Sequence, residues 1–353
     1  MVAMDDPVDD AVAAMVEACR PEWTVEAFER SDHGTNFVCF VTCRTPDGRR
    51  EAVLKATTSE VAPAVARSEP RLFGLVDRET AVPVPDVYGS VDAHETYPAP
   101  FYLVERRPGE NFQGRAGELS AAARERVVAE AGRNLAALHE LGELPRVGRV
   151  GVRGGELVVL DGEYGPCSGF RAWVRAQVEN SLEALADGTY FPELADDPGR
   201  FADLVPRLRE LFERRLAALP EPDPPRYCHW DYRYGNLLVD PETGATEAVL
   251  DWANLLSGDP TYNLAAVEAH LLDPCGDDPD GRVAELRSVL RENYAEARDG
   301  WTVEESVERR VETYLLARRV DAMAAMPLWH EEAGPEGRDE RETVHRAYLR
   351  RYL

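Results

Sequence analysis

One short segment of this 353-residue chain carries the side chains that most restrict its fold. Asp231 and Asn236 stand there in an Asp-x-x-x-x-Asn pattern, and a second carboxylate, Asp251, follows a little further along. Phosphoryl transfer from a metal-bound nucleotide needs an aspartate base, an amide ligand and a carboxylate ligand. The segment supplies all three, so the chain is expected to fold in a way that brings these side chains together around a nucleotide.

The chain contains a single lysine, Lys55, against 39 arginines. It ends the stretch Ala52-Val53-Leu54-Lys55, which parallels the V-A-I-K pattern of a strand in kinase folds. There a compact ammonium reaches the nucleotide phosphates as a point charge, whereas a planar guanidinium suits two-point contacts better. A solvated lysine at the end of a strand is the alternative. Because only this lysine is retained, we favour the nucleotide-binding role.

The first third of the chain has the pattern of an antiparallel sheet. Five runs rich in β-branched and aromatic residues predict strands, at 24–30, 36–44, 50–56, 86–91 and 101–106. The turn Thr45-Pro46-Asp47-Gly48 favours a hairpin between the second and third strands, because proline fixes one corner and glycine tolerates positive φ. A short helix is predicted at 9–20 and a longer helical pattern at 60–78.

Glu69 is the acid best placed in the 60–78 pattern to pair with Lys55 across the sheet. Pro70 follows it directly, and a proline inside a helix removes a hydrogen bond. Glu69 is therefore expected near a kink or in the first turn of a second helix. Glu60 is the alternative partner for Lys55.

The polar turn at 31–36 lies between the first two predicted strands. Gly34, Thr35 and Asn36 within it suit a loop whose backbone N–H groups cover phosphates. The alternative is an ordinary hairpin loop, since the turn has one glycine. We assign these three residues to nucleotide binding because of the motif downstream.

Pro108 and Gly109 break the chain and mark the predicted boundary between two lobes. We predict a nucleotide-binding lobe at 1–106, a linker and following loop at 107–119 and a mainly helical lobe at 120–353. The helices expected there, apart from a surface hairpin at 151–162, span 120–141, 170–186, 199–219, 262–272, 282–298, 303–326 and 336–351.

Taken together, several motifs resemble the aminoglycoside phosphotransferase superfamily, which includes choline, homoserine and fructosamine kinases. The resemblance covers roughly residues 24–330. It rests on Lys55, Pro83-Val84-Pro85, Leu135 to His139, His229-x-Asp231-x-x-x-x-Asn236 and Asp251. It implies an α+β, bilobal, protein-kinase-like fold, with a small antiparallel β lobe and a larger, mainly α-helical lobe.

The resemblance also implies an activity and its cofactors, ATP and Mg²⁺. Asp231 would orient or deprotonate the hydroxyl of a small-molecule acceptor, which would receive the γ-phosphate. Asn236 and Asp251 would bind the metal and Lys55 the phosphates. His229 would support the loop. The adenine would lie against the backbone of Val104, Glu105 and Arg106.

Three positions differ from the common pattern of the superfamily. Trp230 stands where many members have glycine, and it would narrow the acceptor side or pack against the helical lobe. Asn263 stands where aspartate is common, so a supporting charge is missing. Arg233 resembles a subgroup related to acyl-CoA-dehydrogenase-linked kinases, where it would meet an anionic substrate group or transition-state charge, or form a buried ion pair.

Composition narrows the classes of partner. The 65 acidic and 40 basic residues give a net charge of −25, which argues against nucleic acid or an anionic membrane. The first residues lack a basic start and an apolar stretch, so a cytoplasmic location is expected. The main competing function is a catalytically silent, nucleotide-binding regulatory protein of the same fold. The sequence leaves the acceptor, the choice of ATP or GTP and the oligomeric state open.

The acid is spread along the whole chain, which together with the near-absence of lysine is typical of a halophilic protein. Counterions then screen the self-repulsion of the folded state. We therefore predict that the thermal unfolding midpoint rises steadily from dilute buffer to concentrated KCl. A midpoint that is flat or falls over this series would contradict adaptation to salt.

Overall fold

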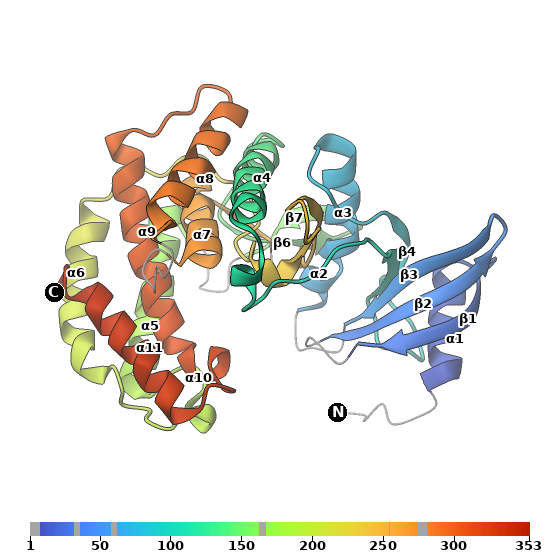
Figure 1. Ribbon diagram of the computed structural model, residues 1–353, viewed down its shortest axis with the longest axis horizontal. Coiled ribbons are helices and arrows are strands. Elements are labelled where there is room, and N and C mark those ends of the chain that lie inside the picture. The colour runs from blue at the N-terminus through green and yellow to red at the C-terminus, as the bar shows by residue number, and fades with distance from the viewer. Residues whose placement is uncertain (1–7, 32–35, 58–61, 162–166, 254, 274–280) are drawn as a thin grey trace.

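The computed structural model describes residues 8–31, 36–57, 62–161, 167–253, 255–273 and 281–353. Figure 1 shows an antiparallel sheet with helix α1 at one end of the molecule. Helices α5, α6, α9 and α11 lie at the other end, and α4 lies between the two. This is the mixed α and β architecture expected from the sequence.

The N-terminal sheet contains the five predicted strands in the order β1-β2-β3-β5-β4, with every neighbouring pair antiparallel. The hairpin at Thr45 and Gly48 forms as its turn chemistry predicts, and these two residues are the last pair of its register. Helix α1 spans Val8–Cys19. The strands are β1 Thr24–Arg30, β2 Phe37–Thr45, β3 Gly48–Ala56, β4 Val87–Val91 and β5 Phe101–Glu105.

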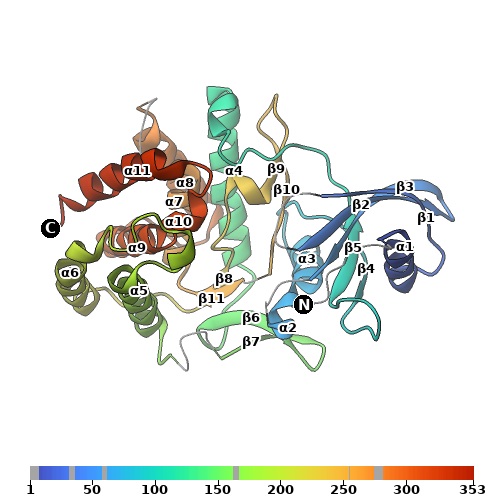
Figure 2. The ribbon, with the colours of Figure 1, turned by 90° about the horizontal axis from the view of Figure 1, so that it is seen from below.

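Alternation along β3 decides where the lysine points. Leu54 and its neighbours Ala52 and Ala56 are buried in the apolar cluster that includes α1. Because successive side chains of a strand point to opposite faces, Lys55 lies on the other face of the sheet. That face is covered by helix α3, as Figure 2 shows, and Tyr102 is the residue paired with Lys55 in the register of β5.

The helical pattern predicted at 60–78 is divided into α2, Pro63–Ala66, and α3, Ser68–Glu79. Glu69 lies in the first turn of α3, one of the two outcomes expected from the proline. Pro70 causes no kink there, since the N–H groups of a first turn have no helical acceptor to lose. Glu60 lies outside the described residues.

The second part of the chain is mainly helical, as predicted, and none of the described helices is long and apolar enough to cross a bilayer. Ser120 caps α4, accepting a hydrogen bond from the Ala123 backbone N–H at 3.1 Å. The helices are α4 Ala121–His139, α5 Phe170–Asp187, α6 Val205–Ala217, α7 Pro260–Leu272, α8 Val283–Ala297, α9 Glu305–Ala324, α10 Met326–Trp329 and α11 Gly334–Leu349. Short 3₁₀ helices span Ala116–Glu118, Pro192–Leu194, Ala202–Leu204 and Tyr234–Asn236.

The described residues of this part also include six short strands, four of which were not predicted from the sequence. The hairpin expected at 151–162 forms from β6 and β7, but it joins a four-stranded sheet of order β7-β6-β11-β8. Strands β9 and β10 pair separately. Their bounds are β6 Gly148–Arg153, β7 Glu156–Val159, β8 Arg226–Cys228, β9 Leu237–Val239, β10 Thr246–Val249 and β11 Leu256–Gly258. Strands β8, β9, β10 and β11 flank the predicted catalytic residues on both sides in sequence.

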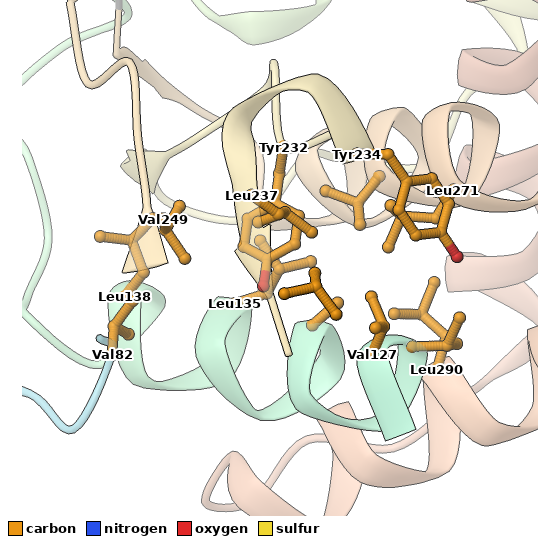
Figure 3. Close-up of a cluster of buried hydrophobic side chains, with 14 of the residues drawn as sticks. Val82, Val127, Leu135, Leu138, Tyr232, Tyr234, Leu237, Val249, Leu271 and Leu290 are labelled. Carbon is orange, nitrogen blue, oxygen red and sulfur yellow. The ribbon is translucent and has the colours of Figure 1, made fainter. Parts of the chain in front are cut away.

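A continuous apolar cluster packs against the strands and the loop that contain the predicted catalytic residues. In Figure 3, Leu135 and Leu138 of α4 point toward Leu237 and Val249, which belong to β9 and β10. Tyr232 lies in the predicted catalytic loop, residues 229–236, and is buried in the same cluster. The loop is thus anchored by its apolar residues, while the polar residues between them remain free to face the site.

Helices α4 and α8 approach closely at Gly132. A Cβ at this position would lie 2.5 Å from the backbone oxygen of Leu290 and 3.0 Å from the backbone nitrogen of Tyr294. Backbone atoms cannot move aside as a flexible side chain can. Gly132 therefore sets the distance between the two helices. By contrast, nothing lies within 4 Å of a Cβ built on Gly74 in α3.

We predict that Gly132→Ala lowers the free energy of unfolding by about 1–3 kcal/mol, because the added methyl overpacks the α4–α8 contact. The matched variant Gly74→Ala should raise it by about 0.5–1 kcal/mol, through helix propensity alone. Urea denaturation of both variants provides the measurement. If the two changes proved equal, close packing at Gly132 would be refuted.

Candidate active site

Three distant segments meet at the carboxylate of Glu69. Lys55 Nζ, from β3, donates to Glu69 Oε2 at 2.7 Å. The backbone N–H of Trp252 donates to Glu69 Oε1 at 3.2 Å. Lys55 Nζ also lies 3.5 Å from Asp251 Oδ1. The structure thus brings Lys55, Glu69 and Asp251 together, and the link through Trp252 ties the N-terminal sheet to the helical part.

The Lys55 ammonium remains charged in this setting. Burial is the largest influence on its pKa and acts to lower it, but the carboxylates of Glu69 and Asp251 together outweigh burial and raise the pKa above its usual value. Tyr102 lies buried beside the pair. Burial, reinforced by the Glu69 charge, raises the pKa of Tyr102 well above its usual value, so its phenol stays neutral.

The side chain of Asn236 is oriented by Asp231. Its Nδ2 donates to the Asp231 backbone oxygen at 2.9 Å and to Asp231 Oδ2 at 2.8 Å. With the amide nitrogen engaged in this way, the amide oxygen is the end left to accept, as a cation ligand must. The backbone N–H of Leu250 donates to the backbone oxygen of Asn236 at 2.8 Å and brings the adjacent Asp251 alongside.

Asp251 has features of a functional position. Its backbone is left-handed, with φ of 61°, a conformation that is uncommon outside glycine, although aspartate and asparagine adopt it more readily than most residues. Its side chain is 41% exposed. Within the described ranges no three or more His, Cys, Asp or Glu residues cluster as a metal site. The pair Asn236 and Asp251 fits Mg²⁺, which typically takes one or two protein carboxylates and completes its shell with phosphates and water.

A buried hydrogen-bond chain supports the start of the catalytic loop. Asn263 Nδ2 donates to the His229 backbone oxygen at 2.9 Å, and Asn263 Oδ1 lies 3.1 Å from His139 Nε2. His139 Nε2 must therefore donate, and its Nδ1 accepts from the Tyr294 hydroxyl at 2.7 Å. His229 Nε2 lies 3.0 Å from the Leu250 oxygen. A neutral amide thus joins α4 to the loop where many superfamily members have aspartate.

Arg233 lies beside Asp231 and is connected to the linker. Its Nε donates to Asp231 Oδ1 at 3.0 Å and its Nη1 to Gln113 Oε1 at 3.1 Å. Gln113 Oε1 also accepts from the Gly235 backbone N–H at 2.9 Å. The Arg233 side chain is 34% exposed, so it does not form the buried ion pair considered from the sequence.

Gln113 and His270 also contact this loop and were not predicted from the sequence. Gln113 lies in a tract recognisable as a loop, but nothing in its composition indicated a contact with Gly235. His270, at the end of α7, has its Nε2 3.9 Å from Asp231 Oδ1. Burial, together with the charges of Arg318 and Arg233, lowers the pKa of His270 well below its usual value. Trp230 packs against the helical part, with the Arg318 guanidinium 5.5 Å from its ring centre.

The other predicted nucleotide-binding residues lie around the sheet. Gly34 and Thr35 are outside the described residues, and Asn36 directly precedes β2. Val104 is buried in β5, and Glu105 ends that strand. Arg106 follows it, with its Nη1 3.5 Å from Glu51 Oε2. These positions border the route from the sheet into the linker, and their contact with a nucleotide stays a prediction.

Residues 38–303 match a sequence model described as the phosphotransferase enzyme family. The chain belongs to this phosphotransferase family. The match contains Lys55, Asp231, Asn236 and Asp251, and it confirms the resemblance drawn from the motifs. No curated protein sequence gave a significant match.

Solved phosphotransferase structures share the fold over nearly the whole chain. A GDP complex of a mutant aminoglycoside 2'-phosphotransferase-IIIa has a TM-score of 0.62 at 14% identity, covering 98% of both chains. The gentamicin complex of APH(2'')-IIa has a TM-score of 0.53 at 14% identity, covering 99% of this chain and 97% of that one. APH(3'')-Id from Streptomyces rimosus, with ADP and streptomycin, has a TM-score of 0.53 at 17% identity, covering 90% and 99%.

The buried state of His139 makes stability sensitive to acid. Burial, with the charge of Arg298, lowers the pKa of His139 to about 3, whereas in the unfolded chain it titrates near 6.5. Between these values the unfolded state binds the extra proton, so this group lowers stability by about 1.4 kcal/mol for each pH unit below 6.5. No such penalty applies above that pH.

We predict that lowering the pH from about 7.5 to 5 reduces the free energy of unfolding of His139→Gln by about 2 kcal/mol less than that of the parent. The reason is that the variant has no buried imidazole to keep unprotonated. At the higher pH the variant should be the less stable protein, since its buried hydrogen bonds are disturbed. Urea denaturation at the two pH values measures both effects. His94→Gln, at an exposed histidine, is the control. Equal acid sensitivity in parent and His139→Gln would contradict the buried neutral state.

Proposed function

We propose that this family member transfers the γ-phosphate of ATP to a hydroxyl of a small molecule. The observation that carries the proposal is the joint at Glu69, where Lys55 Nζ lies 2.7 Å from Glu69 and 3.5 Å from Asp251. A buried carboxylate that holds an ammonium beside a second, exposed carboxylate is the arrangement required to position a metal-bound triphosphate. The Asn236 side chain donates to Asp231, and the Asn236 backbone oxygen accepts from the Leu250 N–H. These two hydrogen bonds connect Asp231, on the acceptor side, to the joint at Glu69.

On the nucleotide side, Lys55 binds the phosphates, and Asn236 and Asp251 hold magnesium. A role for Gly34, Thr35 and Asn36 in covering the phosphates stays a prediction from the sequence. The backbone of 104–106 contacts the base. Magnesium supplies neutralisation of the charge that develops on the transferred group. Because similar structures contain GDP as well as ADP, the same assay should compare ATP with GTP.

On the acceptor side, Asp231 orients the hydroxyl and accepts its proton. The side chain is 40% exposed, and hydrogen bonds from Arg233 and Asn236 hold its two oxygens in place. A loose phosphoryl transition state needs little covalent assistance, so positioning supplies most of the rate. His229 supports the loop through its contact with Leu250.

We predict that Asp231→Asn reduces acceptor-dependent ADP formation by about 10²- to 10⁴-fold, because the side chain can no longer take a proton. Nucleotide affinity should stay close to that of the parent, since Lys55 and Asp251 are unchanged. Coupled ADP assays and nucleotide titrations, both in concentrated KCl, measure these quantities.

Asp77→Asn is the matched control, because Asp77 is an exposed aspartate on α3 and lies outside the proposed site. It should leave turnover unchanged. A parent protein that binds ATP but forms no more ADP than Asp231→Asn, with every acceptor offered, would instead be the silent regulatory protein. Turnover retained in Asp231→Asn would refute the role of Asp231 as the base.

A further inference from the structure

The positive charge next to Asp231 bears on the class of acceptor, provided that the proposed phosphotransferase activity holds. Aspartate and glutamate greatly outnumber arginine and lysine in this chain. Yet the charged side chain in direct contact with Asp231 is an arginine, Arg233. A second arginine, Arg318, contacts His270, whose Nε2 lies 3.9 Å from Asp231 Oδ1.

Arg233 has unused donors at an exposed position. Its Nε is engaged by Asp231 and its Nη1 by Gln113, which is neutral. Among the described residues, none accepts a hydrogen bond from Nη2. A guanidinium offers five N–H donors in a planar fork that matches a carboxylate or a phosphate. Arg233 therefore has donors to offer to an oxyanion.

The groups next to Arg233 are a neutral imidazole and a guanidinium whose carboxylate partner, Asp321, is already paired with it. His270 Nε2 lies 3.0 Å from Arg318 Nη2, so this nitrogen is the acceptor and the imidazole is neutral. Arg318 is 6% exposed and its guanidinium lies over Trp230. Asp321 accepts from the far terminal nitrogen of Arg318 at 3.1 Å. A cationic acceptor at Asp231 would thus face two guanidiniums.

The contact between Arg233 and Asp231 also bears on catalysis. The Arg233 guanidinium occupies Asp231 Oδ1, and the other oxygen, Oδ2, accepts from the Asn236 amide. Moving Arg233 off Oδ1 frees this oxygen to accept a hydrogen bond from the acceptor hydroxyl. An anionic group on the acceptor is the natural competitor for the same guanidinium.

We infer that the acceptor is a hydroxyl compound with its own carboxylate or phosphate group, and that this group draws Arg233 away from Asp231. The acceptor hydroxyl then gives its proton to Asp231 as its oxygen attacks the γ-phosphorus. The bond between that phosphorus and the β,γ-bridging oxygen breaks, and ADP leaves. Arg233 is in this way a specificity-determining residue that couples acceptor binding to release of the base.

The test compares acceptors that differ only in charge. Glycerate is paired with glyceramide, 4-hydroxybutyrate with 4-hydroxybutyramide, and glycerol 3-phosphate with glycerol, while choline and kanamycin represent cations. ADP formation is measured at matched ionic strength, because salt screens charge differences. We expect kcat/KM to favour the charged member of at least one pair by about 10- to 100-fold, the value of a hydrogen bond to a charged group.

Arg233→Gln should abolish this preference in a particular way. We expect kcat/KM for the anion to fall by about 10- to 100-fold, while kcat/KM for the neutral partner stays level or rises because Asp231 is released. Arg233→Lys keeps the positive charge but not the planar set of N–H donors. Its preference for the anion should therefore lie between those of the parent and of Arg233→Gln. Arg214→Gln, which removes an exposed arginine paired with Glu210 on α6, is the control and should keep the parental preference.

Each other outcome has a defined meaning. Equal rates within every pair, or a preference for choline or kanamycin, would overturn the anionic acceptor and leave the phosphotransferase proposal standing. An equal fall in kcat/KM for both members of a pair in Arg233→Gln would also overturn the anionic acceptor, because it would indicate that Arg233 has only a structural role. ADP formation in the parent no higher than in Asp231→Asn, with all acceptors, would reject the proposed function itself.

Discussion

The fold depends on one buried charge that must be paired. The Glu69 side chain is 4% exposed, and an isolated carboxylate at such a position would be very unfavourable. The Lys55 ammonium and the Trp252 N–H satisfy its two oxygens. Strand β3, helix α3 and the chain after Asp251 must therefore meet at this point, whatever the rest of the structure does. The relative placement of the sheet and the helical part follows from that requirement, together with the apolar cluster they share.

Much of the fold could be predicted because its signals are local. The Thr45 to Gly48 turn specifies the hairpin, and the apolar periodicity after Ser120 specifies α4. The strands β8 to β11 have three or four residues each, too few for alternation to be visible. Their partners are also distant in sequence. Arg226 pairs with Gly258, for example, and only the folded chain shows this. Pro70 could be interpreted in two ways until its place in a first turn was known.

The candidate site likewise contains residues that could be predicted from the sequence and residues that could not. Lys55, Asp231, Asn236 and Asp251 could be selected from spacing and from the rarity of lysine, since those features are visible in the sequence itself. His270 and Gln113 could not, because a lone histidine or glutamine in an ordinary tract carries no signal. Their contacts with the catalytic loop arise from the packing of α7 and the linker around it. The left-handed backbone of Asp251 could not be predicted either, because most aspartates have negative φ even though aspartate tolerates positive φ better than most residues.

The rarity of lysine has a chemical consequence as well. In residues 8–353 the only ε-amine is that of Lys55, and it is charged, mostly buried and engaged by carboxylates. A protonated amine is a poor nucleophile, so reagents that acylate or cross-link lysines find almost nothing to react with on this protein. Any ε-amine labelling that does occur reports directly on the phosphate end of the proposed site. Lys55 is thus a single position at which amine chemistry would report on the proposed nucleotide pocket.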